Sequence, residues 1–316
     1  MSIIWNRACM IVVLLGGVPP SSLCQTAVHS ERLELIHDKP FVMVMVNGKG
    51  PFRFVIDTGT GVDALVTPEF AEVLGLSAIG QAKLSDPSKQ CVRSVPIVMI
   101  QSLEVAGFDF RDIKARVHAL GKGEGSYEGL LGFSLFRDYL LTLDFPNREF
   151  TLATGSLLPD GEHSVLSFRT PDGIPIVNLR IGGMPIDAQI DSGGDGLLLP
   201  DRLAAQFKFV SDPAEFGNGE SLSTRFQIRA ARLAPNVEVG DYFFTRPFVE
   251  IGGAFPLANF GSSPLQAFAV TFDQKSKLVR FKAGQKTLSL SAPPTPINLL
   301  NGPPGLPRDR SLVPVD

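Results

Sequence analysis

The chain has 316 residues, of which 44% are hydrophobic and 19% are charged, and its formal net charge is −3. This balance is typical of a globular protein with enough chain for two domain-sized cores, and it gives no electrostatic basis for binding nucleic acid or an anionic membrane. The 31 glycines and 25 prolines, against one tryptophan and three tyrosines, indicate many short strands joined by turns.

The N-terminal segment has the pattern of an export signal. A single charge, Arg7, precedes an apolar run from Ala8 to Val18, which is too short to span a bilayer but suits the core of a signal peptide. We therefore expect residues 1–27 to be removed and the mature protein to be periplasmic or secreted. Cys24 raises the alternative of a lipid anchor, but Leu23 before it is not the small residue that lipid attachment favours.

Residues 33–57 predict two strands joined by a tight turn. Apolar residues at 33–36 and 41–46 precede Asn47-Gly48-Lys49-Gly50, and residues 51–56 return as a second strand. This strand runs into Asp57-Thr58-Gly59-Thr60. Because glycine lets the backbone turn sharply, the carboxylate of Asp57 is expected at the junction between a strand and a loop.

A short helix and further strands complete the first half of the chain. Thr67 can cap a helix that begins at Pro68 and ends at Gly75. Further strands are predicted at 95–100, 103–105, 117–120, 141–145 and 149–152.

The same order of signals recurs in the second half. Residues 174–181 repeat the first strand, and residues 198–207 repeat the helix. Pro185 stands six residues before Asp191, as Pro51 stands six residues before Asp57. Two apolar segments also correspond, namely Leu130-Leu131-Gly132 and Asn259-Phe260-Gly261. We infer an internal repeat of roughly 130 residues.

The repeat divides the chain into four parts. The signal peptide (1–27) is followed by a first lobe (28–155), a second lobe (156–283) and a proline-rich tail (284–316) that is expected to be flexible.

The segments Ile56-Asp57-Thr58-Gly59-Thr60 and Ile190-Asp191-Ser192-Gly193-Gly194 resemble the two catalytic loops of aspartic proteases of the pepsin and retropepsin group. The resemblance covers about residues 33–283 and implies a mainly β fold. In that fold two homologous aspartic-protease-like β-barrel lobes with short helices are related by a pseudo-twofold axis. The short spacing looks closest to retropepsin-like bacterial proteins with both halves fused in one chain.

The resemblance assigns the catalytic pair to Asp57 and Asp191. In aspartic proteases in general, two carboxylates about 3 Å apart cannot both ionise, so they share one proton. The ionised member can activate water and the protonated member can polarise the scissile carbonyl. No cofactor is implied, and the chain has no metal-ligand spacing of His, Cys, Asp and Glu.

Supporting roles also follow from the resemblance. Thr58 and Ser192 are expected to hydrogen-bond across the two loops. Gly59 and Gly193 are expected to bring backbone N–H groups close to the carboxylates. The two apolar-apolar-glycine segments are expected to support the catalytic loops.

Three departures from the family pattern stand out. Thr60 keeps a hydroxyl after the first motif, whereas Gly194 follows the second, so the outer hydrogen bond to Asp191 is expected to be missing. Asn259 breaks the apolar pattern of the second supporting segment. Flaps are expected at about 78–94 and 211–227, and neither stretch contains a tyrosine. Asp63 and Asp195, near the motifs, are expected to be solvated turn residues.

The sequence thus predicts an exported aspartic endopeptidase that binds an extended peptide between its lobes. One alternative is a non-catalytic peptide- or protein-binding protein on the same scaffold, because fold does not fix function. A monomer is expected. The alternative is a dimer in which Asp57 pairs with Asp57 of a second copy. Neither a nucleic-acid partner nor a stable membrane span is expected.

Overall fold

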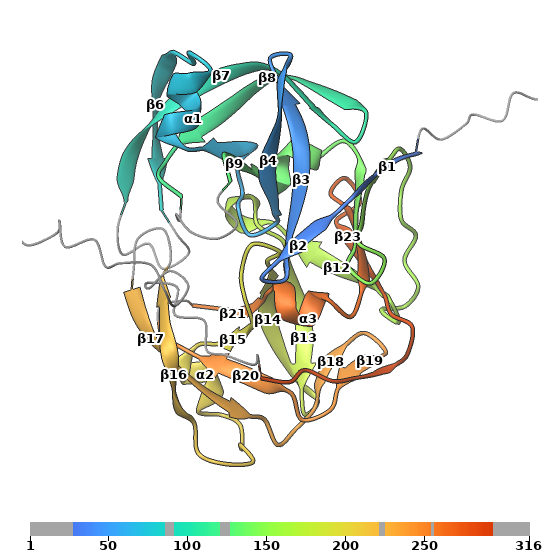
Figure 1. Cartoon of the computed structure of the whole chain (residues 1–316). Coiled ribbons are helices and arrows are strands. Elements are labelled where there is room, and N and C mark those ends of the chain that lie inside the picture. The colour runs from blue at the N-terminus through green and yellow to red at the C-terminus, as the bar shows by residue number, and fades with distance from the viewer. Residues whose placement is uncertain (1–27, 86–91, 121–126, 221–224, 254–255, 293–316) are drawn as a thin grey trace, which may run out of the picture.

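The computed structural model describes residues 28–85, 92–120, 127–220, 225–253 and 256–292. The predicted signal peptide therefore lies outside the described residues. The structure is mainly β, as the sequence predicted (Figure 1). In the described ranges the α-helices are short, namely α1 (Pro68–Val73), α2 (Asp201–Ala204) and α3 (Ser262–Leu265). No helix in this part of the chain is long and apolar enough to cross a membrane.

One sheet of eight strands belongs to the first lobe, which lies at the top of Figure 1. In spatial order its strands are β2 (Glu34–Ile36), β3 (Lys39–Val46), β4 (Lys49–Asp57), β9 (Gly129–Gly132), β5 (Ala64–Val66), β8 (Phe108–Val117), β7 (Arg93–Val105) and β6 (Ala78–Leu84).

The second sheet runs from the side of the first lobe through the second lobe. Its main path is β1 (Val28–Arg32), β11 (Glu149–Ala153), β10 (Leu140–Asp144), β22 (Ala269–Asp273), β23 (Leu278–Lys282), β12 (Val165–Arg169), β13 (Ile176–Ile181), β14 (Met184–Ile190), β21 (Ala258–Phe260), β15 (Leu197–Leu199), β20 (Phe248–Ile251), β17 (Arg225–Arg232) and β16 (Ala214–Glu220). Off this path, β19 (Tyr242–Phe244) pairs with both β18 (Val237–Val239) and β24 (Thr287–Leu288), and β18 also pairs with β13.

The strands that lead to the two aspartates have the same neighbours in both halves. β4 is antiparallel to β3 and parallel to β9, and β14 is antiparallel to β13 and parallel to β21. In turn β9 is antiparallel to β5, and β21 is antiparallel to β15. These repeated pairings are compatible with the pseudo-twofold relation that the sequence predicted.

The two halves join through strands β10 and β22, which are antiparallel neighbours. Thr142 of the first half lies opposite Thr271 of the second, and their hydroxyl oxygens are 2.9 Å apart. Each strand ends in an aspartate that accepts hydrogen bonds from the following turn, because Asn147 N donates to Asp144 and Ser276 N donates to Asp273, both at 3.0 Å. The matching positions of these two aspartates are compatible with the predicted repeat.

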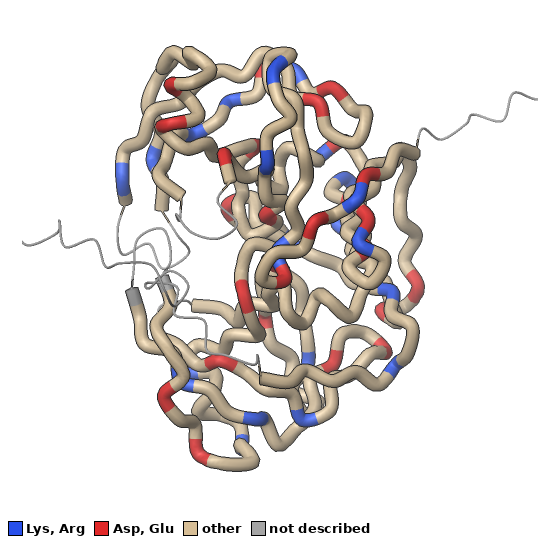
Figure 2. Tube along the Cα trace, viewed as in Figure 1, with Lys and Arg blue, Asp and Glu red and all other residues tan. Residues whose placement is uncertain are grey.

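A continuous core of aliphatic and aromatic side chains runs through both lobes. Phe133 of the first half packs edge-on against Phe272 and Phe168 of the second, with ring centroids 5.2 and 5.9 Å apart. Burial of such apolar surface is the main favourable term in folding. Residues of both charges are interspersed along the chain (Figure 2).

Local predictions were best where a capping or turn signal is strong. Thr67 caps α1 by accepting a hydrogen bond from Phe70 N at 3.1 Å, as predicted. The helix predicted at 198–207 is wrong in length, because Leu197–Leu199 form strand β15 and α2 covers only Asp201–Ala204. The strand predicted at 117–120 is wrong in its bounds, because β8 covers Phe108–Val117. The charged residues within β8 interrupt the apolar pattern, so its earlier part was not predicted.

Residues 284–292 are a correction to the predicted flexible tail. β24 pairs in parallel with β19, and the side chains of Leu288 and Leu290 are buried. Backbone hydrogen bonds continue the contact, from Thr245 N to Leu288 O and from Phe248 N to Leu290 O. These two leucines contribute to the core, so the segment belongs to the second lobe. Residues 293–316 lie outside the described residues.

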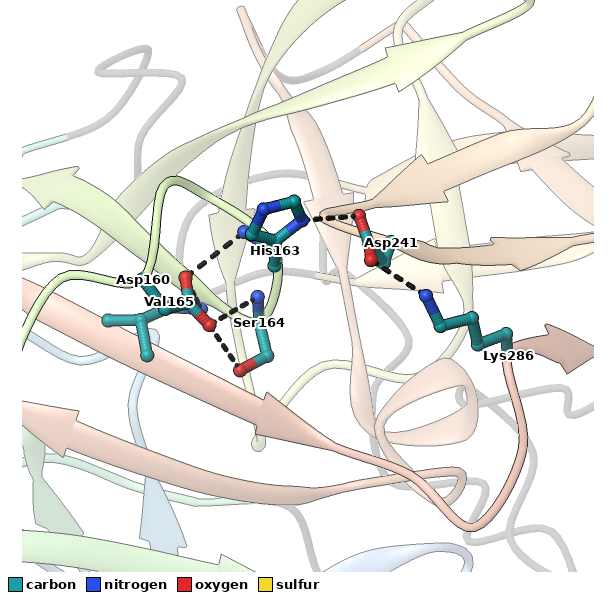
Figure 3. A network of polar contacts seen from close by, with 6 residues as sticks. All are labelled: Asp160, His163, Ser164, Val165, Asp241 and Lys286. Atoms are coloured by element: carbon teal, nitrogen blue, oxygen red, sulfur yellow. Dashed lines mark hydrogen bonds and ion pairs between the residues drawn. The ribbon is translucent and has the colours of Figure 1, made fainter.

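A polar network holds the loop at residues 160–165, where the chain passes into the second lobe (Figure 3). Asp160 accepts hydrogen bonds from His163 N, Val165 N and both N and Oγ of Ser164, at 2.6–3.0 Å. Nearby, Asp241 accepts from Lys286 Nζ at 2.7 Å and lies 3.1 Å from His163 Nδ1. The network joins this loop to the β18–β19 turn and to the segment before β24.

Burial acts to raise the pKa of Asp160, but its hydrogen bonds outweigh this and hold the pKa below the ordinary value. We predict that Asp160→Ala lowers the free energy of unfolding by about 1–2 kcal/mol, because three backbone N–H groups lose their acceptor. Ser164→Ala, which removes one of the four bonds, should cost less.

Urea unfolding at several pH values tests this prediction. A carboxylate with a lowered folded pKa contributes stability above its unfolded pKa, and this contribution is lost as the pH falls through the folded pKa. The difference between wild type and Asp160→Ala should therefore shrink below about pH 4. A difference that stays constant down to pH 2 would contradict the role of the ionised carboxylate.

Candidate active site

The two predicted catalytic aspartates lie against each other's loops. A Cβ atom added at Gly59 would lie 2.3 Å from Asp191 Oδ1, and one added at Gly193 would lie 2.5 Å from Asp57 Cγ. Only glycine allows this approach. The two carboxylates are close enough for the charge of Asp191 to raise the pKa of Asp57. One chain supplies both carboxylates, so a pair built from Asp57 of two copies is not required.

Thr58 and Ser192 connect the two loops beneath the aspartates, and both side chains are fully buried. Thr58 N donates to Ser192 Oγ and Ser192 N donates to Thr58 Oγ1, each at 3.0 Å. Each hydroxyl then donates to the opposite strand, Thr58 Oγ1 to Ile190 O at 2.8 Å and Ser192 Oγ to Ile56 O at 2.7 Å. The hydrogen bonds expected between these residues are therefore present in reciprocal form.

The apolar-apolar-glycine segments support the loops from behind. Strand β9 ends at Gly132, and the next residue, Phe133, donates its N–H to Thr60 O at 2.8 Å. In the second lobe Ser262 N donates to Gly194 O at 3.0 Å. A Cβ at Gly132 would lie 2.0 Å from the carbonyl oxygen of Val62. Only glycine at position 132 therefore lets the supporting segment lie this close to the loop.

Asp57 accepts two hydrogen bonds from its own loop. Gly59 N donates to its Oδ1 at 2.8 Å, and Thr60 Oγ1 donates to its Oδ2 at 2.9 Å. Burial raises the pKa of Asp57 to about 7, the charge of Asp191 adds to this, and the bonds from Thr60 and Gly59 oppose it. Burial and the neighbouring charge therefore both favour the protonated form of Asp57.

Asp191 accepts more hydrogen bonds than Asp57. Gly193 N and Gly194 N donate to its Oδ1 at 3.0 and 2.9 Å. Its Oδ2 accepts from Asn259 Nδ2 at 2.8 Å, with Gln189 Nε2 at 3.4 Å. The prediction of a missing outer hydrogen bond is therefore wrong, because Asn259 supplies the donor that Gly194 lacks.

The prediction that Asp63 and Asp195 are solvated turn residues was also wrong. Asp195, expected to be a solvated turn residue, lies 3.0 Å from Lys39 Nζ, and both side chains are about three-quarters buried. Burial acts to lower the pKa of Lys39, but Asp195 outweighs it and raises the pKa. Asp63 is likewise paired, with Arg137. Isolated charges in strands and loops gave no sequence signal for these contacts.

Two further titratable groups surround the site. Burial raises the pKa of Glu250 on β20 to about 7, and the charge of Asp195 adds to this. Tyr127 packs edge-on against Phe41 with ring centroids 5.5 Å apart. Burial raises its pKa, Lys39 opposes this, and the charges of Asp57 and Asp195 add to it. Tyr127 therefore shares the electrostatic environment of Asp57, and both side chains share that of Asp195.

The stretches expected to form flaps are β-hairpins. β6 pairs with β7 in the first lobe, and β16 pairs with β17 in the second. Both hairpins lie on the same side of the molecule, at the left of Figure 1. Residues 86–91 and 221–224, between the paired strands, lie outside the described residues. Among the described residues, no cluster of three or more His, Cys, Asp or Glu side chains could hold a metal ion.

The mainly β fold and the two aspartate loops are compatible with the aspartic-protease-like architecture that the sequence predicted. Residues 42–135 match a family model described as aspartyl protease. The matched stretch begins in β3 and includes the first aspartate loop and its supporting segment. The sequence resemblance to aspartic proteases of the retropepsin-like clan is thereby confirmed. No curated protein matches the chain significantly.

We predict that Thr58→Val and Ser192→Ala each lower the free energy of unfolding by about 1–3 kcal/mol, because each leaves buried donors or acceptors without partners. The double variant should lose less than the sum, since both changes remove one network. Chemical unfolding of the four proteins measures this. Thr151→Val, on β11, is the control and should change stability by less than about 0.5 kcal/mol. Additive losses would contradict a single reciprocal network.

Proposed function

We propose that the protein is an aspartic endopeptidase that hydrolyses peptide bonds with a water molecule activated by Asp57 and Asp191. The family match supports protease activity in general. The observation that carries the specific proposal is the contact of each carboxylate with the glycine of the opposite loop. Two like carboxylates in such contact favour one shared proton, as in aspartic proteases in general.

The hydrogen bonds suggest how the proton is distributed. Asp191 accepts from Gly193, Gly194 and Asn259, and Asp57 accepts from Gly59 and Thr60. Donors to a carboxylate stabilise its charged form. Asp191 is thus the ionised member and Asp57 the protonated one.

Peptide hydrolysis then proceeds in two steps, after which both aspartates have returned to their starting protonation states. Asp191 takes a proton from water as the oxygen attacks the carbonyl carbon, while Asp57 gives its proton to the carbonyl oxygen and a gem-diol forms. In the second step Asp191 gives its proton to the amide nitrogen, the C–N bond breaks, and a gem-diol hydroxyl returns a proton to Asp57. The Thr58–Ser192 bonds hold the carboxylates in position for both steps.

The substrate class we propose is an extended peptide or unfolded protein segment. The hairpins β6–β7 and β16–β17 come from different lobes and lie on one side of the molecule (Figure 1). An extended peptide between them could form strand-like hydrogen bonds and present alternate side chains to each lobe. We also propose export to the periplasm or outside the cell, on the basis of the signal-like pattern of residues 1–27.

We predict that Asp57→Asn and Asp191→Asn each reduce cleavage of a denatured protein substrate by at least about a thousandfold, because the proton transfers need both groups. In the wild type, activity should fall about tenfold per pH unit above pH 7, as the pair loses its remaining proton. A pH–rate profile with a fluorogenic peptide measures both effects.

Two variants serve as controls. Glu250→Gln should keep the alkaline limb, because Glu250, whose pKa is also raised to about 7, takes no part in proton transfer. Asp57→Asn should be folded and, at pH 7, more stable than wild type, because the amide carries no charge to bury. The sign follows because a raised carboxyl pKa makes the folded state lose stability as the pH rises from about 4 to 7.

Retained cleavage in Asp57→Asn would contradict the dyad. An inactive wild type that binds peptides at the same site would instead favour the alternative, a non-catalytic binding protein on this scaffold.

A further inference from the structure

We propose that Asn259 is a positioning residue that replaces the hydroxyl missing at Gly194 and keeps Asp191 as the ionised member of the pair. The inference rests on the proposed function, since it concerns the same two aspartates. It begins with the 2.8 Å hydrogen bond from Asn259 Nδ2 to Asp191 Oδ2. The equivalent oxygen of Asp57 accepts from Thr60 Oγ1 at 2.9 Å.

The two lobes place these donors on different elements. Leu130 on β9 lies opposite Val55 of β4, two residues before Asp57. Asn259 on β21 lies opposite Gln189 of β14, two residues before Asp191. Position 259 therefore corresponds to position 130, where the first lobe has an apolar side chain. The outer donor comes from the loop in the first lobe and from the supporting strand in the second, where Gln189 Nε2 adds a longer contact at 3.4 Å.

A side chain at position 194 and the amide of Asn259 cannot both occupy the space beside Asp191 in the second lobe. A Cβ added at Gly194 would lie 2.6 Å from Asn259 Nδ2 and 2.7 Å from Asp191 Oδ2. Contacts this short do not occur between a Cβ and its neighbours, so a side chain at 194 and the asparagine amide compete for the same space. The absence of a side chain at Gly194 is therefore what lets the amide reach the carboxylate.

The chemical difference between the two donors makes one aspartate better suited to carry the charge and the other better suited to hold the proton. A hydroxyl such as that of Thr60 can donate to an ionised carboxylate or accept from a protonated one, whereas an amide NH₂ group only donates. Asn259 Nδ2 thus favours charge on Asp191, while Thr60 tolerates a proton on Asp57. The amide adds to the backbone donors Gly193 N and Gly194 N.

The asparagine is not explained by packing. Its Oδ1 is buried and has no hydrogen-bond partner among the described residues. A buried acceptor without a partner costs stability, and an apolar side chain of similar size would avoid that cost, as Leu130 does in the first lobe. The amide is therefore best accounted for by what its NH₂ group does to Asp191.

Other charges face the same carboxylates and must be held constant. Asp57 is the direct neighbour of Asp191, and Lys39, paired with Asp195, also acts on Asp191. Tyr127 acts with Asp57, and Glu250 acts with Asp195. A substitution at 259 leaves all of these groups in the protein, so a change in titration can be traced to the lost donor.

The test compares Asn259→Leu with the double variant Asn259→Leu/Gly194→Thr, which rebuilds in the second lobe the pair that the first lobe has in Thr60 and Leu130. Asn259→Leu should reduce kcat/KM about tenfold and move the acid limb of the pH–rate profile up by about one pH unit, as expected for one lost charge-assisted donor. Its thermal stability should equal or exceed that of wild type.

Gly194→Thr alone should be impaired, because the added Cβ collides with both Asn259 Nδ2 and Asp191 Oδ2. In the double variant only the collision with Asn259 is removed, so the loop must move before the threonine hydroxyl can replace the amide, and a return of the acid limb toward its wild-type position would support the proposal. A parallel loss of stability and activity in Asn259→Leu without movement of the acid limb would overturn it.

A second readout separates this proposal from the proposed function. Carboxyl ¹³C chemical shifts of Asp191 should show ionisation at a lower pH in wild type than in Asn259→Leu, whether or not the protein cleaves peptides. Unchanged titration of Asp191 would refute the role of Asn259. Absence of cleavage by wild type, with the expected change in titration, would refute only the peptidase.

Discussion

The reciprocal hydrogen bonds between Thr58 and Ser192 are the interaction on which the rest of the site depends. Each residue is fully buried, and each exchanges a backbone N–H and a hydroxyl with the opposite loop. Because the hydroxyls also donate to Ile190 O and Ile56 O, the loops are tied to the strands that deliver the aspartates. The rigid base fixes two carboxylates that would otherwise move apart, since bringing like charges into a buried site is unfavourable.

The reciprocal hydrogen bonds between Thr58 and Ser192 are alike in the two loops, but the side chains next to the two aspartates differ. The first lobe has a threonine hydroxyl beside Asp57, and the second has an asparagine amide beside Asp191. Asp195, which follows the second loop, pairs with Lys39 of β3, and the carboxyl of Glu250 is affected by the charge of Asp195. A duplicated fold can bring two equivalent acids together, but chemistry that needs one acid and one base benefits from unequal surroundings.

Much of the fold could be predicted from local signals. The aspartate loops, the hairpin before Asp57 and the Thr67 cap each depend on a few adjacent residues. The bond from Asn259 to Asp191 joins residues 68 positions apart, and it was missed because a polar residue in an apolar segment looks like a defect when the segment is read alone. β24 was missed for a related reason. Its polar neighbours and the prolines that begin at Pro293 indicate a tail, and only β19 gives it a partner.

The central claim is that one chain brings Asp57 and Asp191 into a single site that acts on one bound group. A crystal structure with a statine-type peptide, whose hydroxyl mimics the tetrahedral intermediate, tests it most directly. The account predicts that this hydroxyl lies within about 2.6–3.2 Å of both carboxylates, with the peptide extended between the lobes. Carboxylates separated by intervening side chains, or an inhibitor bound away from them, would contradict it.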